Sequence, residues 1–186
     1  MNTLFRCGWV LGAGLLLAVP LAAADDPSPR AVEAIQLLSS NDPYQRQTGF
    51  LRLEALREPA TVWTVAAHLR SEDPQMRAWS ARALAAIQGA AAAPQLLVVL
   101  KNDQHPDVRR AVLLGFEPLY AGDPAIPPAL IAALNDRDAE VRMAAVDIVS
   151  RMDEPRAREA LLVRNRREHN RNVRRVLSLA MKRIGM

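Results

Sequence analysis

The chain has only one cysteine, Cys7, among its 186 residues. A single cysteine cannot close a disulfide within the chain, and thiolate metal sites need more than one sulfur ligand. Histidine is also scarce, and His68, His105 and His169 match no H-x-x-x-H or H-E-x-x-H zinc spacing. We therefore expect the protein to hold no metal and no other cofactor.

Glycine and the aromatic residues are few as well, with eight glycines and 4% aromatic residues. No glycine-rich phosphate loop and no G-x-S-x-G nucleophile motif is present, so we expect no enzyme and assign no catalytic residue. No run of alternating β-branched residues bounded by turns predicts a strand. We expect Trp63 and Trp79 to pack between helices; stacking on a ligand is the alternative.

The first 24 residues have the pattern of a secretory signal. Arg6 precedes the apolar run CGWVLGAGLLLAV, and the small residues at 22–24 precede the acidic pair at 25–26. We expect cleavage after Ala24 and a periplasmic or secreted protein. The alternative is an uncleaved anchor, although Pro20 interrupts a stretch that is barely long enough to span a membrane. Residues 25–186 then form one domain.

An arginine recurs along that domain at nearly constant spacing. The gaps between successive members are 31, 32, 33 and 32 residues, and the series is Arg46, Arg77, Arg109, Arg142 and Arg174. A period of this length is typical of a solenoid that stacks copies of one supersecondary unit.

Positions counted from these ladder arginines predict one helix per copy, which we name the B helix. At −4 stand short polar residues or a histidine suited to an N-cap: Asp42, Asp73, His105, Asp138 and Asn170. Proline follows the cap in three copies, where its missing N–H does no harm. The +10 position is always apolar: Leu56, Ile87, Leu119, Met152 and Ile184. Together with +3 and +7 it marks one buried helix face.

A shorter apolar segment precedes each B helix and predicts a second helix, the A helix. These segments lie at residues 31–38, 60–69, 95–100, 129–134 and 156–163, each near a proline. Helices this short are unstable alone and must pack on their neighbours. We therefore predict an all-α superhelix of five helix pairs that uses nearly all of residues 25–186.

The repeats resemble a known family. Residues 103–111 (DQHPDVRRA) and 136–145 (DRDAEVRMAA) are similar to the core of HEAT repeats, in the short form named after phycobilisome lyases. The first and last copies depart from the pattern, at Gln45, Glu168 and Asn170. The resemblance implies a superhelix whose B helices line the concave side, and a ladder in which aspartates and arginines bond within and between repeats. It does not specify an activity.

We interpret the ladder arginines as structural, although a row of guanidinium groups would also grip phosphate. Each arginine lies one turn after a polar cap and can bond the carboxylate of that cap or the loop carbonyls. The ladder then comprises the five arginines and the aspartates Asp42, Asp73, Asp103, Asp136 and Asp138.

Three positions of the B helix, +1, +5 and +8, point away from the predicted buried face. If the B helices line the concave side, these positions form a groove suited to a protein or peptide partner. The candidate partner-binding residues are Arg110, Leu114, Glu117, Met143, Asp147, Arg175, Leu179 and Lys182.

Charge is unevenly distributed along the chain. Residues 25–150 carry a net charge of −4, whereas residues 151–186 carry +7. The basic end either binds an anionic partner or is a solvated end-cap. Nucleic acid is not an expected partner, because a signal would export the protein and no aromatic residues lie among these arginines.

Three functions remain open at this point. The first, which we favour, is a non-catalytic scaffold or accessory protein of the bacterial periplasm that binds another protein through the concave face. The second is a lyase-like or chaperone-like protein of the bilin lyase type. The third is a peripheral membrane binder that uses the basic end on anionic lipid.

Overall fold

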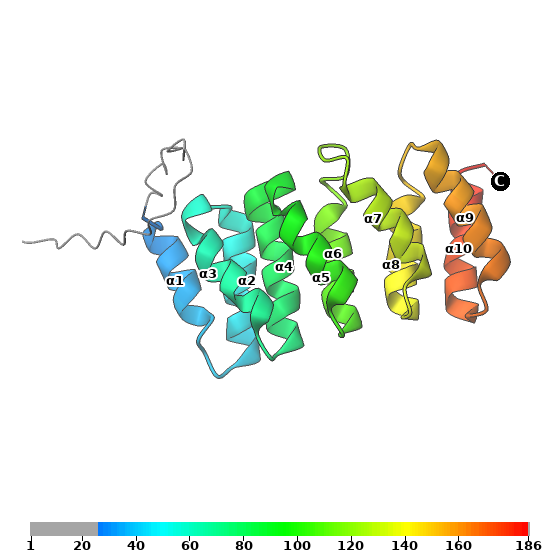
Figure 1. Cartoon of the computed structure of the whole chain (residues 1–186). Helices are drawn as coiled ribbons and strands as arrows, with labels where there is room; N and C mark the ends of the chain where they lie inside the picture. The colour runs from blue at the N-terminus through cyan, green and yellow to red at the C-terminus, as the bar shows by residue number, and fades with distance from the viewer. Residues whose placement is uncertain (1–25, 186) are drawn as a thin grey trace, which may run out of the picture.

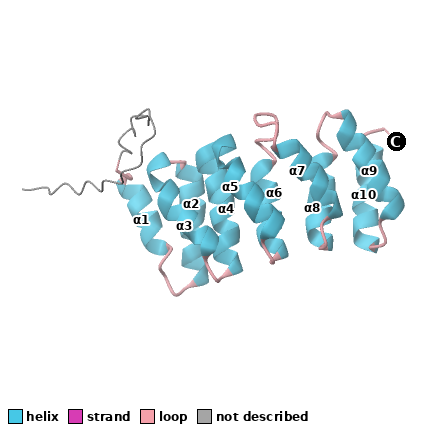
Figure 2. Ribbon diagram, viewed as in Figure 1, coloured by secondary structure: helices cyan, strands magenta, loops and turns pink. Residues whose placement is uncertain are grey.

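The protein is a single row of stacked helix pairs. The structure is a computed structural model and describes residues 26–185. The pairs follow one another along the row in chain order, from the N-terminal end to the C-terminal end (Figure 1). Residues 26–185 contain helices, turns and loops and no strand (Figure 2). The predicted all-α fold of five helix pairs is confirmed. The predicted signal lies outside the described residues.

The A helices are short, and three of them include a 3-10 turn. Their elements are α1 (Pro29–Leu37), η1 (Pro59–Thr61) with α3 (Val62–Ala67) and η2 (His68–Arg70), η3 (Gly89–Ala92) with α5 (Ala93–Asn102), α7 (Ile126–Ala132) with η4 (Ala133–Asn135), and α9 (Pro155–Arg167). Proline is the first residue of α1, η1 and α9, where its fixed φ suits the first turn and its lack of an N–H leaves no donor unpaired.

The B helices are longer, and a side chain caps each of them. They are α2 (Pro43–Leu56), α4 (Pro74–Gln88), α6 (Pro106–Phe116), α8 (Ala139–Val149) and α10 (Arg171–Arg183). The side chain at −4 accepts a hydrogen bond from the amide two residues later in every copy, for example Asp73 from Gln75 at 2.8 Å. Helices α6 and α8 end at +7, before the predicted +10, yet Met152 at +10 is still buried.

One apolar segment, Pro74–Asn102, has the length and mean hydropathy (1.8) of a membrane-spanning helix. It does not form one regular α-helix, because α4 ends at Gln88 and the next residue, Gly89, has a φ of +58° that suits a residue without a side chain. The chain then continues through η3 into α5, which packs against α6. Its apolar residues Leu84 and Leu96 are fully buried, so they belong to the core of the stack.

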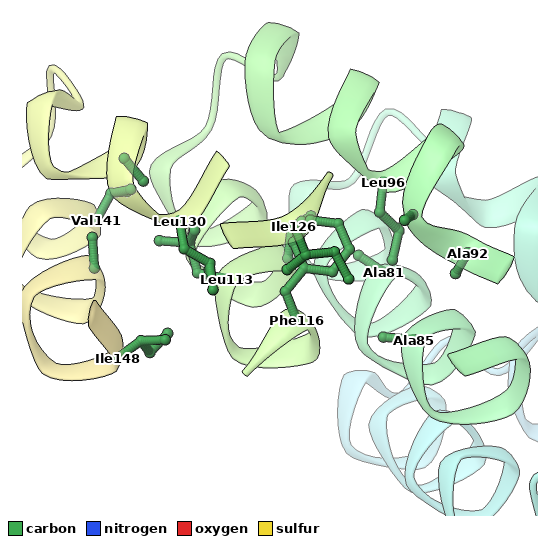
Figure 3. Close-up of a cluster of buried hydrophobic side chains, with 14 of the residues drawn as sticks. Ala81, Ala85, Ala92, Leu96, Leu113, Phe116, Ile126, Leu130, Val141 and Ile148 are labelled. Atoms are coloured by element: carbon green, nitrogen blue, oxygen red, sulfur yellow. The ribbon is translucent and has the colours of Figure 1, made fainter. Parts of the chain in front are cut away.

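The core is continuous from pair to pair. In the middle of the row, Phe116 and Leu113 of α6 lie close to Ile126 and Leu130 of α7, with Ala81 and Ala85 of α4 nearby (Figure 3). Successive B helices pack directly on one another, whereas successive A helices touch far less. The A helices therefore splay apart, which places the B helices on the more closely spaced side of the stack.

Both end faces of the row are polar where the inner repeats are apolar. Position −1 is buried Met76, Val108, Val141 or Val173 in the last four repeats, but it is exposed Gln45 in the first. Position +4 is buried Phe50, Ala81, Leu113 or Val146 in the first four repeats, but it is exposed Ser178 in the last. Atypical polar residues are what end repeats need where one face meets water.

Candidate functional site: the arginine ladder and the B-helix groove

Four ladder arginines bind the loop of their own repeat through one nitrogen. Nη1 of Arg109 donates to the carbonyls of Asp103 at 2.9 Å and Gln104 at 3.1 Å. Arg46, Arg77 and Arg142 donate to the two corresponding carbonyls of their own loops, at 2.9–3.2 Å. These bonds hold the turn between the A helix and the B helix closed.

The rest of each guanidinium reaches the next repeat. Nε and Nη2 of Arg109 donate to both oxygens of Asp136, at 2.8 and 2.7 Å. The same two-bond arrangement joins Arg77 to Asp103 and Arg142 to Glu168, whereas Arg46 makes a looser ion pair with Asp73 at 3.5 Å. Each arginine therefore ties two successive repeats together.

The prediction that each ladder arginine can bond the cap carboxylate of its own helix is wrong. The arginines bond the loop carbonyls as predicted, but no ladder arginine within residues 26–185 pairs with the cap of its own helix. Asp42 and Asp138 serve as N-caps and form no ion pair with a ladder arginine. The carboxylate comes from one repeat further along, since stacking brings the next loop closer to the guanidinium than its own cap.

Three carboxylates that ladder arginines bind, those of Asp103, Asp136 and Glu168, have lowered pKa values. Burial raises the pKa of Glu168, but hydrogen bonds from Arg142, the amide of Asn170 and Arg164 outweigh it and lower the pKa to about 2. The pKa values of Asp103 and Asp136 are lowered in the same way: burial opposes the shift, and the arginine of the preceding repeat, with a backbone amide, overcomes it.

The face formed by the B helices is hollowed across α2, α4 and α6. One hollow of about 520 Å³ includes Glu54, Arg82, Leu114 and Glu117 in its lining. A second of about 320 Å³ includes Gln47, Arg82, Arg110 and Leu114. Because Arg82 and Leu114 line both hollows, we treat them as one surface, the B-helix groove. The apolar side chain at its centre, Leu114, is 44% exposed.

The structure brings part of the predicted partner-binding set to this groove. Leu114, Arg110 and Glu117 line it. Met143 is only half exposed and packs against the core, so the prediction that it lies on an outward face is wrong. Asp147 of α8 lines neither hollow. The three candidates on α10 are exposed and lie beyond the groove: Arg175, Leu179 and Lys182.

Charged pairs continue from the groove toward the last repeat. Glu117, the residue that follows α6, pairs with Arg151, which also donates to Asp147 of α8 at 2.8 Å. Asp147 in turn accepts a hydrogen bond from Arg183 of α10 at 3.3 Å. The sequence placed Glu117, Asp147 and Arg82 at the groove positions +8 and +5. It did not single out Arg151, and the spacing from the ladder does not show which acid Arg82 or Arg151 meets.

The two tryptophans behave differently. Trp79 packs on Phe50 with ring centroids 6.0 Å apart, as predicted. Trp63 on α3 is 82% exposed, so the prediction that it packs between helices is wrong. It borders a hollow of about 560 Å³ on the opposite, A-helix side, with Val98 across from it on α5. The wide spacing of the A helices leaves the Trp63 ring uncovered.

Within residues 26–185, no three His, Asp or Glu side chains gather as a metal site requires. Most of the carboxylates buried in the ladder are already bound by arginine.

This arrangement of helices is similar to that of known proteins. A family model described as HEAT repeats matches residues 31–116 and 93–182. The fold also matches a chain in the solved complex of CpcE and CpcF of phycocyanin lyase from Nostoc sp. PCC7120, with a TM-score of 0.68 and 22% identity. The match covers 81% of this chain and 97% of that chain. No curated protein matches.

The comparison corrects one prediction. The sequence, without a catalytic motif, predicted that the protein is not an enzyme, but a chain of nearly the same extent belongs to a lyase complex. A stack of repeats with no familiar motif therefore does not exclude enzymatic activity, and we withdraw that prediction. At 22% identity the likeness shows the fold, whereas the family model covers most of the sequence. The chain belongs to the HEAT-repeat family.

Proposed function

We propose that this protein binds another protein chain along the B-helix groove. The observation that carries the proposal is the pair of adjoining hollows across α2, α4 and α6, which share the exposed Leu114 and Arg82. The lining mixes charged side chains with apolar ones such as Trp79, Leu114 and Leu119. Apolar side chains within a solvated polar rim are the usual layout of a binding hot spot.

The lining of the groove indicates what kind of segment fits. Gln47, Arg82 and Arg110 are hydrogen-bond donors around Leu114. Arg82 also pairs with Glu54 at 3.0 Å and Arg110 with Asp107 at 3.1 Å, in each case through Nη2. An extended or helical peptide with one apolar anchor and flanking carbonyl or carboxylate groups matches these donors. The similar Nostoc chain was solved in a complex of two proteins, which supports a protein as the partner.

The proposal includes the cellular compartment in which the partner is bound. Residues 1–24 have the composition of a secretory signal, so we propose that the complex forms outside the cytoplasm, in the periplasm of a bacterium.

The test uses Leu114→Asp, with Val98→Asp as its matched control. Both residues are exposed apolar side chains, but Val98 lies on the A-helix side. A partner recovered from the envelope fraction by the wild type, once purified, is expected to bind Leu114→Asp at least about tenfold more weakly, a loss of about 1.4 kcal/mol. It is expected to bind Val98→Asp as tightly as the wild type. Equal affinity for all three proteins contradicts the groove as the binding site.

A lyase-type role is the second candidate, and the extent of the structural match favours it. The match covers 97% of a chain from a phycocyanin lyase complex. Incubation of the purified protein with phycocyanin, followed by absorption spectroscopy, tests it. A spectral change that depends on the protein supports this candidate, and an unchanged spectrum, with or without a second subunit, contradicts it.

A further inference from the structure

The ladder has one member that is not used. Arg174 stands at the same register position as Arg77, Arg109 and Arg142, but no further repeat follows it among the described residues. Within residues 26–185 its side chain forms no ion pair and no hydrogen bond, and it is exposed, whereas Arg109 is only 3% exposed. The end of the stack thus presents an exposed guanidinium group. At the four equivalent positions, the arginine uses this group to bind a carboxylate.

The surroundings of Arg174 reinforce its positive charge. The exposed arginines Arg166, Arg167, Arg171 and Arg175 also form no ion pair within the described residues. The one carboxylate in the adjoining loop, Glu168, is buried and bound by Arg142 and Arg164. This end therefore attracts negative charge from outside the chain.

The occupied rungs show which ligand such an arginine accepts. Each two-bond carboxylate also accepts a hydrogen bond from the backbone amide two residues later: Asp103 from His105, Asp136 from Asp138 and Glu168 from Asn170, all at 2.8 Å. The ligand is thus an acidic residue whose own turn holds the carboxylate flat toward the guanidinium.

We propose that Arg174 is an open rung that docks an acidic turn of a partner protein end-on to the stack. The partner is a protein with an Asp or Glu that opens such a turn. A second copy of this chain is disfavoured, because the contact would press Ser178 against the polar first repeat at Gln45 and bury little apolar surface. This surface is separate from the B-helix groove, and the proposal does not depend on it.

The test uses a peptide that copies residues 134–141 (LNDRDAEV), the turn that Arg109 binds, as a minimal probe. Titration into the ¹⁵N-arginine-labelled protein is expected to shift the Nε–Hε signal of Arg174 saturably. The peptide with Asp136→Asn is expected to bind roughly tenfold more weakly, since the ionic hydrogen bonds are lost. Arg174→Gln and Arg174→Lys lack that signal, so their binding is measured by the fluorescence anisotropy of the dye-labelled peptide, in parallel with the wild type and the control variant. Both are expected to lose binding, because lysine keeps the charge but not the paired donors.

The control variant is Arg52→Gln, which removes an exposed arginine at the other end of the stack. Circular dichroism checks that every variant is folded. An equal loss with Arg52→Gln, full binding by Arg174→Lys, or no saturable shift overturns the proposal. So does binding to phosphatidylglycerol vesicles or inorganic phosphate without a response to the peptide, which would assign the basic end to lipid or to free anions. A failure here leaves the Leu114 experiment unaffected.

Discussion

At the scale of single residues, the ladder arginines have the largest structural role. Arg109 satisfies two carbonyls of its own loop and both oxygens of Asp136 while almost fully buried. A lysine has one ammonium group and cannot bond two carbonyls and a carboxylate in one plane, so the position requires arginine. Arg174 has no such partners among residues 26–185, so an arginine at this position does not by itself confer the structural role.

Replacement of Arg109 by alanine is therefore expected to lower the free energy of unfolding by about 3 kcal/mol, because the half-buried carboxylate of Asp136 loses its ionic partner and keeps only the amide of Asp138 as a donor. Urea denaturation measures the change. Arg174→Ala is the control and is expected to change stability by less than about 0.5 kcal/mol. An unchanged unfolding midpoint for Arg109→Ala would contradict a structural role for the ladder.

At the scale of helices, close approach of the B helices sets the shape of the stack. Gly115 of α6 faces Ala85 of α4, and a Cβ added at Gly115 would lie 2.8 Å from the Ala85 Cβ. Gly49 of α2 is equally close to α1, where an added Cβ would lie 2.7 Å from the Ala34 carbonyl oxygen. These glycines are placed in helices despite their low propensity because a methyl group there would force the helices apart.

Gly115→Ala is expected to destabilise the protein by about 1 kcal/mol, since overpacking outweighs the gain in helix propensity. The clash involves two short side chains that cannot rotate away. A double-mutant cycle with Ala85→Gly measures the coupling, because removal of the opposing methyl group should recover most of the loss. Additive effects of the two substitutions would contradict direct contact between α4 and α6 at this point.

At the scale of the whole molecule, stability is shared between neighbouring repeats. Each of the five repeats contributes a helix pair, and each of the first four also contributes an arginine that binds the following repeat. The polar residues Gln45 and Ser178 lie at the two ends. In such a stack each repeat contacts only the repeats next to it, so a substitution that weakens one interface destabilises first the two repeats that share it.

The buried carboxylates of the ladder make this stability dependent on pH. The pKa of Glu168 is about 2 in the folded protein and near 4.5 when unfolded, so its contribution is present above pH 4.5. It is lost as pH falls from 4.5 toward 2, because the unfolded chain then binds the proton more tightly. Asp103 and Asp136 act in the same direction.

Thermal unfolding between pH 6 and pH 3 is expected to show a falling melting temperature as the pH decreases. Glu168→Gln should be less stable at pH 6 and should show a shallower pH dependence than the wild type, since it cannot titrate. An identical slope for wild type and variant would show that Glu168 is not a source of the acid sensitivity.

Much of the fold was readable from local pattern. The spacing of Arg46 and its counterparts is a period of the linear sequence that shows the repeat directly. The caps at Asp42 and Asp73 and the apolar +10 residues are properties of single helices, and the period of 3.6 residues places them on a face without knowledge of the neighbours. Only the tertiary structure decided which repeat supplies the carboxylate to each arginine, why Trp63 is exposed while Trp79 is packed, and that Arg82 and Arg151 pair across helices. The reach of a long side chain spans two repeats, so its partner depends on the distance and angle between stacked pairs, and these emerge only when the pairs pack.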